Sequence, residues 1–120
     1  MNRESVIREK ANLVVALLKK YFKGKSNDEL YNVLCKYNED TDLKIDDYDF
    51  LFGGMTIYIN DDKNVFEIRN EAVYKLDAEN NELVNIITFP EVLNKIEKDP
   101  DVNGWDVLID YLQKELVNDN

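Results

Sequence analysis

The sequence contains no histidine, and this absence excludes several kinds of chemistry. Histidine is the commonest general base near neutral pH and the usual activator of serine and cysteine nucleophiles. With no histidine and one cysteine, the 120-residue chain cannot assemble a zinc site of the usual kind. Its four glycines form neither a GxGxxG pattern nor a P-loop, and the spacing of its carboxylates offers no catalytic pair. We therefore predict a protein that is not an enzyme and uses no cofactor.

Disulfide and membrane signals are lacking as well. A single cysteine, Cys35, cannot form an internal disulfide, which is typical of a reducing compartment. Because Cys35 lies one place off an apolar helical stripe and has no nearby base, we expect it to pack in a buried or half-buried position. The longest apolar block, Leu13–Leu18, is far short of the roughly 20 residues of a membrane span. With no signal-peptide pattern, we expect a cytoplasmic protein without a membrane partner.

Charge is abundant and unevenly distributed. The net charge is −10, but residues 1–25 carry seven basic and two acidic side chains, whereas the remaining 95 residues carry eight basic and 23 acidic ones. Such an acidic body repels nucleic acid and attracts basic proteins, although acidity also serves solubility alone. The basic first segment would suit a nucleic acid, but packing against the acidic body and neutralising it locally explains it more simply. We predict a basic protein partner and no nucleic-acid partner.

Apolar periodicity predicts two helices at the start of the chain. Apolar residues recur at steps of three and four from Val6 to Phe22, as on a helix that faces a core, and Gly24 then provides a left-handed stop. The capping box of residues 26–29 begins a second helix, whose apolar face runs from Leu30 to Tyr37. We expect an acidic connector from Asn38 to Asp49.

After Gly53 and Gly54 the apolar period changes to two, which indicates strands. Turn-forming sequences divide this region into an antiparallel meander of four predicted strands, at residues 55–59, 65–69, 72–76 and 83–89. Phe89 and Pro90 return the chain to helix, and Asp99–Pro100 separates two C-terminal helices, the second carrying Trp105 into the core. The fold class is thus α+β: two N-terminal helices, a four-stranded antiparallel meander and two C-terminal helices in a single domain, residues 1–120.

One segment matches a calcium-binding loop. Asp99, Asp101 and Asn103 occupy positions one, three and five of the EF-hand pattern, with glycine at the sixth place and Asp110 at the twelfth. Two features argue against a metal: the usually aliphatic eighth place is Asp106, and an apolar helical stripe begins before the loop would end. The alternative is a proline-containing helix break followed by a helix N-cap. We predict no metal site and keep this loop as the weaker calcium candidate.

Acidic clusters with neighbouring tyrosines form the predicted partner-binding site. The clusters lie on expected loops, and the tyrosines would act as amphipathic anchors, because aromatic residues dominate interface energetics. Ordinary turn residues are the alternative explanation for the clusters. The predicted partner-binding residues are Asp46, Asp47, Tyr48, Asp49, Tyr58, Asp61, Asp62 and Tyr74.

Three segments together form a recognisable pattern. Residues 47–54, Asp-Tyr-Asp-Phe-Leu-Phe-Gly-Gly, show an apolar and acidic segment that runs into paired glycines. A tyrosine-bearing strand follows at residues 73–77, and a phenylalanine opens a short helix at residues 89–93. In these segments the chain resembles the SUKH-type bacterial immunity proteins. The resemblance covers about a third of the chain, and the two-helix N-terminus and the short sheet depart from the family. It implies an immunity protein that binds and neutralises a secreted toxin.

These observations predict a small acidic inhibitor that neutralises a basic protein target such as a nuclease toxin, as an immunity protein of a toxin–antitoxin kind does. An alternative is a phage anti-defence protein, for example an anti-CRISPR inhibitor that imitates nucleic acid. Another is a calcium- or partner-binding adaptor domain. Exposed aromatic residues would equally suit a homodimer contact. The sequence is rich in Asn, Lys and Asp, which is consistent with a bacterial or phage source.

Overall fold

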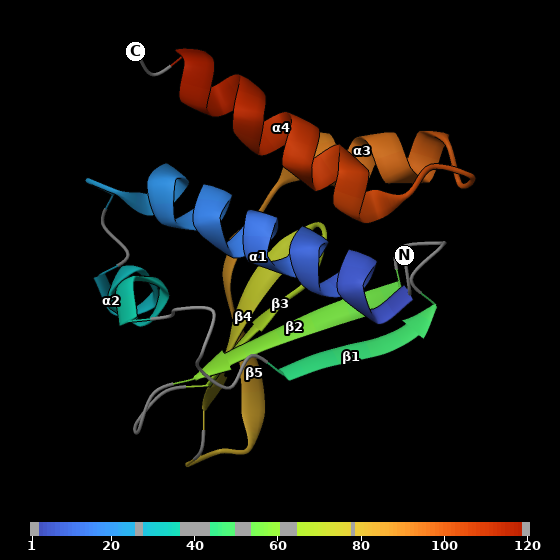
Figure 1. Cartoon of the computed structure of the whole chain (residues 1–120). Coiled ribbons are helices and arrows are strands. Elements are labelled where there is room, and N and C mark those ends of the chain that lie inside the picture. Colours follow the sequence, from blue (N-terminus) through green and yellow to red (C-terminus); the bar gives the residue numbers. More distant parts are fainter. Residues whose placement is uncertain are drawn as a thin grey trace.

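The computed structural model describes residues 3–25, 28–36, 44–49, 54–60, 65–77 and 79–118. Figure 1 shows α1, α3 and α4 on one side of a sheet, with α2 near one end of it. None of the helices in these ranges is long and apolar enough to span a bilayer. The elements in chain order are α1 (Arg3–Phe22), α2 (Asp28–Lys36), β1 (Lys44–Asp49), β2 (Gly54–Asn60), β3 (Val65–Ile68), β4 (Ala72–Asp77), β5 (Glu82–Thr88), α3 (Pro90–Lys98) and α4 (Gly104–Asn118).

The sheet is an antiparallel meander in the order β1-β2-β3-β4-β5. The predicted α+β class is confirmed, with two helices before the sheet and two after it, and β2 to β5 are the four predicted strands. β1 is an additional strand in a region that the sequence assigned to an acidic connector. Its register with β2 sets Ile45 opposite Ile57 and Asp46 opposite Thr56. The sequence did not indicate this strand, because strands pair through backbone groups. A mostly charged edge strand lacks the β-branched and aromatic residues by which a strand is usually recognised.

The core lies between α1, α4 and one face of the sheet. On α1, Ile7, Ala11, Val14 and Leu18 are buried at helical spacing, and Lys19 and Lys20 that follow are exposed. The sheet contributes the alternate residues of β2 and β3, together with Val73 of β4. Each large apolar side chain buried in this way contributes about 1.5–3 kcal/mol relative to exposure. Burial of one sheet face therefore explains why the strands alternate.

The predicted end of the first helix is confirmed at Gly24. This residue follows α1 with φ of 80°, and the amide of Lys25 donates to the carbonyl of Phe22 at 3.0 Å. Glycine enters this left-handed conformation without the steric cost that a Cβ imposes. The expected capping serine of α2, Ser26, lies outside the described residues.

Cys35 is exposed, so the expected buried or half-buried position is wrong. On α2 the buried side chains are Leu30, Val33 and Leu34, and the next residue has already turned toward solvent. An apolar stripe at helical spacing predicts which residues lie at the buried centre of the helix face. Whether a residue at the edge of the stripe is buried depends on how the helix is rotated about its axis. The hydroxyl of Tyr31, one turn before, hydrogen-bonds with Cys35, and this bond raises the pKa of Tyr31.

Four aromatic rings join α1, α3 and α4 where these helices meet. Tyr21 packs edge-on against Phe22 and Phe89, with ring centroids 5.2 and 5.8 Å apart. The Phe89 ring also lies 5.6 Å from that of Tyr111. Burial, followed by a hydrogen bond with Tyr21, raises the pKa of Tyr111 well above its usual value. The cluster therefore packs α1 and α4 against each other and against the start of α3.

The start of α4 packs tightly against the turn between β3 and β4. Trp105 is fully buried, which confirms its predicted place in the core. A Cβ added to Gly104 would lie 2.1 Å from Nδ2 and 2.8 Å from Cγ of Asn70, and 3.2 Å from Cδ1 of Ile96. Glycine at this position thus allows the helix to approach the turn.

Gly104→Ala is expected to destabilise the fold despite the higher helix propensity of alanine. Overpacking of this kind costs about 1–3 kcal/mol, and the propensity gain returns about 1 kcal/mol. Urea denaturation should therefore show a lower free energy of unfolding. The double variant Asn70→Ala/Gly104→Ala should lose less free energy of unfolding than the two single variants lose in sum. Strict additivity in this double-mutant cycle would contradict the steric explanation.

Candidate protein-binding face

The sheet face that points away from α1 and α4 presents a mixed polar and apolar surface. Side chains alternate between the two faces of a strand, so the neighbours of the buried Ile57, Phe66 and Ile68 point to this opposite side. Register aligns Tyr58, Glu67, Tyr74 and Asn85 as one row across β2 to β5. We call this surface the outer face: Thr56, Tyr58, Glu67, Arg69, Tyr74, Leu76, Leu83 and Asn85.

A carboxylate, a guanidinium and a tyrosine ring form the centre of the outer face. Arg69 donates through Nε to Oε2 of Glu67 at 2.7 Å, and its Nη2 lies 2.5 Å from the same oxygen. The guanidinium carbon lies 4.6 Å from the centroid of the Tyr74 ring. The Glu67 residue is 9% exposed, whereas the Arg69 side chain is 42% exposed. Arg69 is thus held by two neighbours and still reaches solvent.

Electrostatics favours the charged form of this guanidinium. Burial alone would lower the pKa of Arg69, but the hydrogen bond and the charge of Glu67 outweigh it, and the pKa is raised. A cation over an aromatic face gains about 0.5–1 kcal/mol at exposed sites, so Tyr74 adds to this preference. The pair is therefore a fixed, oriented ion pair on a sheet face that Figure 1 shows free of α1, α3 and α4.

Apolar surface flanks the ion pair. Tyr58 and Tyr74 are half-buried, and Leu76 of β4 is paired with Leu83 of β5, which is 45% exposed. Tyrosine and arginine are the residues that protein interfaces concentrate, because they combine apolar area with hydrogen-bonding groups. The outer face therefore has residue types that are common in protein interfaces.

Two of the predicted partner-binding residues, Tyr58 and Tyr74, are brought together on the outer face. They come from β2 and β4, and both pair in register with Glu67 of β3. Residues 46–49 were expected on a loop, and this expectation is wrong, because they form β1 and pair with β2. Their register places Asp46 opposite Thr56 and Asp47 opposite Met55. Asp61 and Asp62 lie outside the described residues.

Sequence reasoning missed Glu67 and Arg69. The alternation of Phe66 and Ile68 toward the core already implied that Glu67 points to the other side. An acidic and a basic residue two places apart in a strand then share a face, which is a signal for an ion pair. The stacking of Arg69 on Tyr74 had no such signal, because it depends on the register between β3 and β4.

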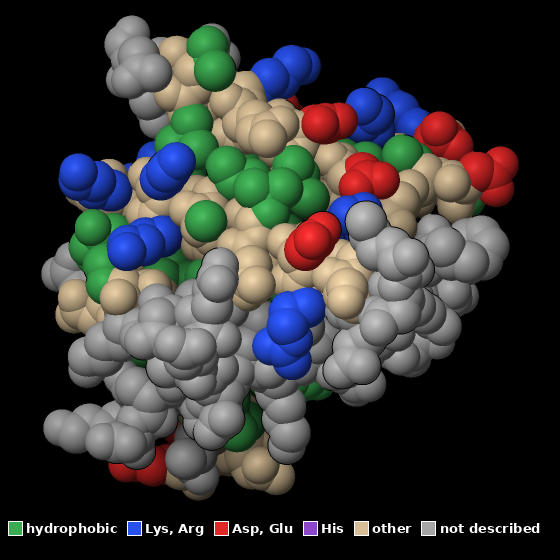
Figure 2. Space-filling model, viewed as in Figure 1, with side chains coloured by type: hydrophobic (Ala, Val, Ile, Leu, Met, Phe, Trp, Pro, Cys, Tyr) green, Lys and Arg blue, Asp and Glu red, His purple; other side chains and the backbone are tan. Residues whose placement is uncertain are grey.

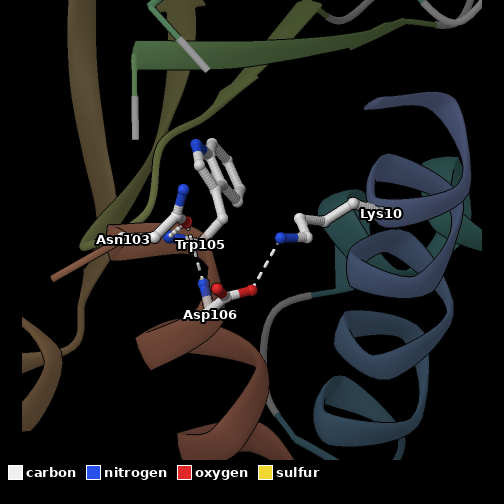
Figure 3. Close-up of polar contacts among 4 residues, drawn as sticks. All are labelled: Lys10, Asn103, Trp105 and Asp106. Carbon is white, nitrogen blue, oxygen red and sulfur yellow. Dashed lines mark hydrogen bonds and ion pairs between the residues drawn. The ribbon is translucent and has the colours of Figure 1, made fainter. Parts of the chain in front are cut away.

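The candidate calcium segment is occupied by helix-capping interactions (Figure 3). Oδ1 of Asn103 accepts hydrogen bonds from the amides of Trp105 and Asp106, at 3.0 and 3.2 Å. Because α4 begins at Gly104, Asp110 lies within the helix rather than in a loop. Oδ1 of Asp99 accepts from the amide of Asp101 at 3.3 Å. In the described ranges, no group of three or more His, Cys, Asp or Glu side chains is arranged to hold a metal ion. The geometry is that of a helix break followed by an N-cap.

Basic residues of α1 meet the acidic body at one described ion pair with α4. Nζ of Lys10 lies 2.7 Å from Oδ1 of Asp106, as Figure 3 shows. Asp106 lies in the first turn of α4, where its charge also suits the helix dipole. At the other end of α1, Lys19, Lys20 and Lys23 are exposed, and Figure 2 shows basic side chains gathered there. Local neutralisation therefore explains Lys10.

The chain shows no significant match to any protein-family model, curated protein sequence or solved structure.

Asn103→Ala is expected to lower the free energy of unfolding by about 1 kcal/mol, because two amides at the start of α4 lose their acceptor. Asn103→Asp keeps the acceptor and should leave stability nearly unchanged. Thermal denaturation followed by circular dichroism measures both. Equal losses in the two variants would show that the capping oxygen does not stabilise α4.

Arg69→Ala is expected to destabilise the protein by about 1–3 kcal/mol, because it leaves the shielded Glu67 carboxylate without its partner. The double variant Glu67→Leu/Arg69→Met removes both charges and should fall within about 1 kcal/mol of the parent protein. Urea denaturation at neutral pH gives these values. A double variant as unstable as Arg69→Ala would contradict the assignment of the loss to an unpaired carboxylate.

Proposed function

We propose that the protein is a stoichiometric inhibitor that binds a basic protein target, such as a nuclease toxin, through the outer face of its sheet. The observation that supports this most directly is the row of Tyr58, Glu67 and Tyr74, which carries two aromatic anchors around a fixed ion pair. Anchors on a rigid sheet bind at a small entropic cost, since the side chains are already oriented.

The charge of the chain supports a basic target. With a net charge of −10, the protein attracts a positively charged surface before contact, and this steering raises the rate of association. An inhibitor gains from fast association, because it must reach a toxin or an effector before substrate does. The proposal applies equally to an immunity protein and to a phage inhibitor of a host nuclease, because both targets carry basic, nucleic-acid-binding surfaces.

The proposal is tested by affinity capture from the native host, or from cells that carry the neighbouring genes, at low and high salt. We expect one basic protein in stoichiometric amount, released as salt rises. The purified partner must then lose activity when the inhibitor is added at an equimolar ratio. Tyr58→Ala/Tyr74→Ala should weaken capture at least tenfold without unfolding the protein. A captured protein that keeps its full activity would contradict inhibition.

Reversing the charge of the predicted acidic cluster should slow association with the target. Asp46→Lys, Asp47→Lys and Asp49→Lys together change the charge by six units on β1, directly beside β2. We expect the association rate with the captured target to fall at least tenfold at low salt, measured by surface plasmon resonance.

A matched control separates this local effect from net charge. Glu97→Lys, Asp101→Lys and Asp110→Lys make the same change of charge at exposed positions of α3, α4 and their connection. This variant should reduce association less than the β1 variant does. Equal losses in the two variants would remove the acidic cluster from the binding site and leave only the overall charge.

A further inference from the structure

Among the described residues, β5 is an edge strand, and no further strand pairs with its first half. It ends the sheet in the order β1-β2-β3-β4-β5, and all four residues from Glu82 to Asn85 are exposed. Leu83 and Val84 point to opposite faces, yet they are 45% and 46% exposed. Figure 1 shows this end of the β4–β5 hairpin extending beyond the helices. An edge of this kind offers unpaired backbone groups together with apolar surface on both sides.

The two edges of the sheet differ in how their sequences discourage pairing. β1 has four charged residues among its six and an irregular register between Asp47 and Asp49. Charges and bulges are the usual means by which proteins protect a sheet edge. β5 has one charged residue, Glu82, among its seven, with no lysine or proline. The register of β5 with β4 is also irregular, between the pairs Tyr74–Asn85 and Val73–Ile87. This irregularity comes after Asn85, so Glu82–Asn85 pair regularly with β4.

The hairpin turn holds this open edge in place. Oδ1 of Asp77 accepts from the amide of Glu79 at 3.0 Å, and Oδ2 accepts from the side chain of Asn80 at 2.8 Å. These bonds, the one to Asn80 first, lower the pKa of Asp77, so its carboxylate is charged at neutral pH. Asn81 completes the turn with φ of 54°, a conformation that asparagine tolerates. These contacts, together with the pairing of β5 with β4, set the position of the strand that follows.

The surroundings of the open edge are acidic. Asp77, Glu79 and Glu82 lie at the end of the hairpin. Lys75 of β4 is paired with Val84, but its ammonium forms an ion pair with Oε2 of Glu29. A second copy of the chain would bring a second set of these carboxylates to the same edge. Charge thus favours a basic segment over self-association.

We propose that Glu82–Asn85 of β5 accepts an extended basic segment of the partner protein as a sixth strand of the sheet. Backbone hydrogen bonds would supply affinity, as in other cases of strand addition, and side chains would supply specificity. An apolar residue of the segment would lie beside Leu83 or Val84, and a lysine or arginine beside Glu82. The inference rests on the proposed function, from which the positive charge of the partner is taken. Leu83 belongs to both surfaces, so the proposed strand-binding site is continuous with the outer face.

The test uses the whole protein labelled with nitrogen-15 and a nine-residue peptide of alternating lysine and valine. We expect the amide signals of Glu82–Asn85 to shift on titration and to exchange more slowly with deuterium. A peptide with glutamate in place of lysine should not bind. Two further peptides, N-methylated on one or the other set of alternate amides, keep the positive charge, and one of them should bind at least tenfold more weakly, because it blocks the pairing edge.

Leu83→Lys/Val84→Lys places two positive charges on exposed positions and should weaken binding of the lysine–valine peptide at least tenfold. Asn94→Lys/Gln113→Lys adds the same two positive charges at exposed positions of α3 and α4, so it is the matched control and should bind almost as the parent does. Equal affinity for both N-methylated peptides, or shifts spread over all carboxylate-bearing segments, would overturn strand addition. A concentration-dependent dimer with protected β5 amides would also overturn it, because a second copy would occupy the edge.

Failure of this inference is distinguishable from failure of the proposed function. If Leu83→Lys/Val84→Lys still captures and inhibits the host target at full strength, the inhibitor proposal stands and the strand-addition site is wrong. If the peptide binds β5 as expected but no basic target is captured or inhibited, strand addition stands and the inhibitor role is wrong.

Discussion

Burial of a single face of the sheet is the constraint on which the rest of the structure depends. α1 and α4 place their apolar stripes against this face, and the largest fully buried side chains of the common core are Trp105, Phe66 and Phe89. With α1, α3 and α4 on one side of the sheet (Figure 1), β2 and β3 alternate between residues that face the core and residues of the outer face. The outer face is a consequence of this one-sided arrangement: Thr56 and Glu67 are buried there, whereas Tyr58, Arg69 and Tyr74 remain partly exposed.

The outer face differs from an ordinary solvated sheet surface in how its charges are placed. Glu67 is nearly buried among its neighbours, and Arg69 compensates it while stacking on Tyr74. A buried ion pair adds little stability compared with apolar residues of similar size. Its orientation is the property that a binding surface would use, and the partly exposed Arg69 is held over Tyr74. The same strands carry this pattern toward Leu83, so the outer face and the open edge of β5 form one continuous region.

Capping interactions explain the segment whose sequence most resembled a metal site. Asn103 has the side chain that a calcium loop would use, but its oxygen accepts from two amides at the start of α4. Gly104, which would provide the bend of such a loop, instead gives room for Asn70. Calcium loops and helix N-termini favour the same residues, because both need short oxygen-bearing side chains near backbone amides. A linear pattern therefore does not separate them, whereas the position at which the helix begins does.

The sequence by itself determined the α+β class, the helical ends of the chain, the left-handed stop at Gly24 and the strands β2 to β5, because these follow from local period and turn chemistry. It also indicated Tyr58 and Tyr74, although not that they would share one row. Only the tertiary structure decided that residues 44–49 form a strand, that Cys35 is exposed and that Arg69 stacks on Tyr74. Each of these depends on strand register or helix rotation, which are set by contacts between residues far apart in the chain.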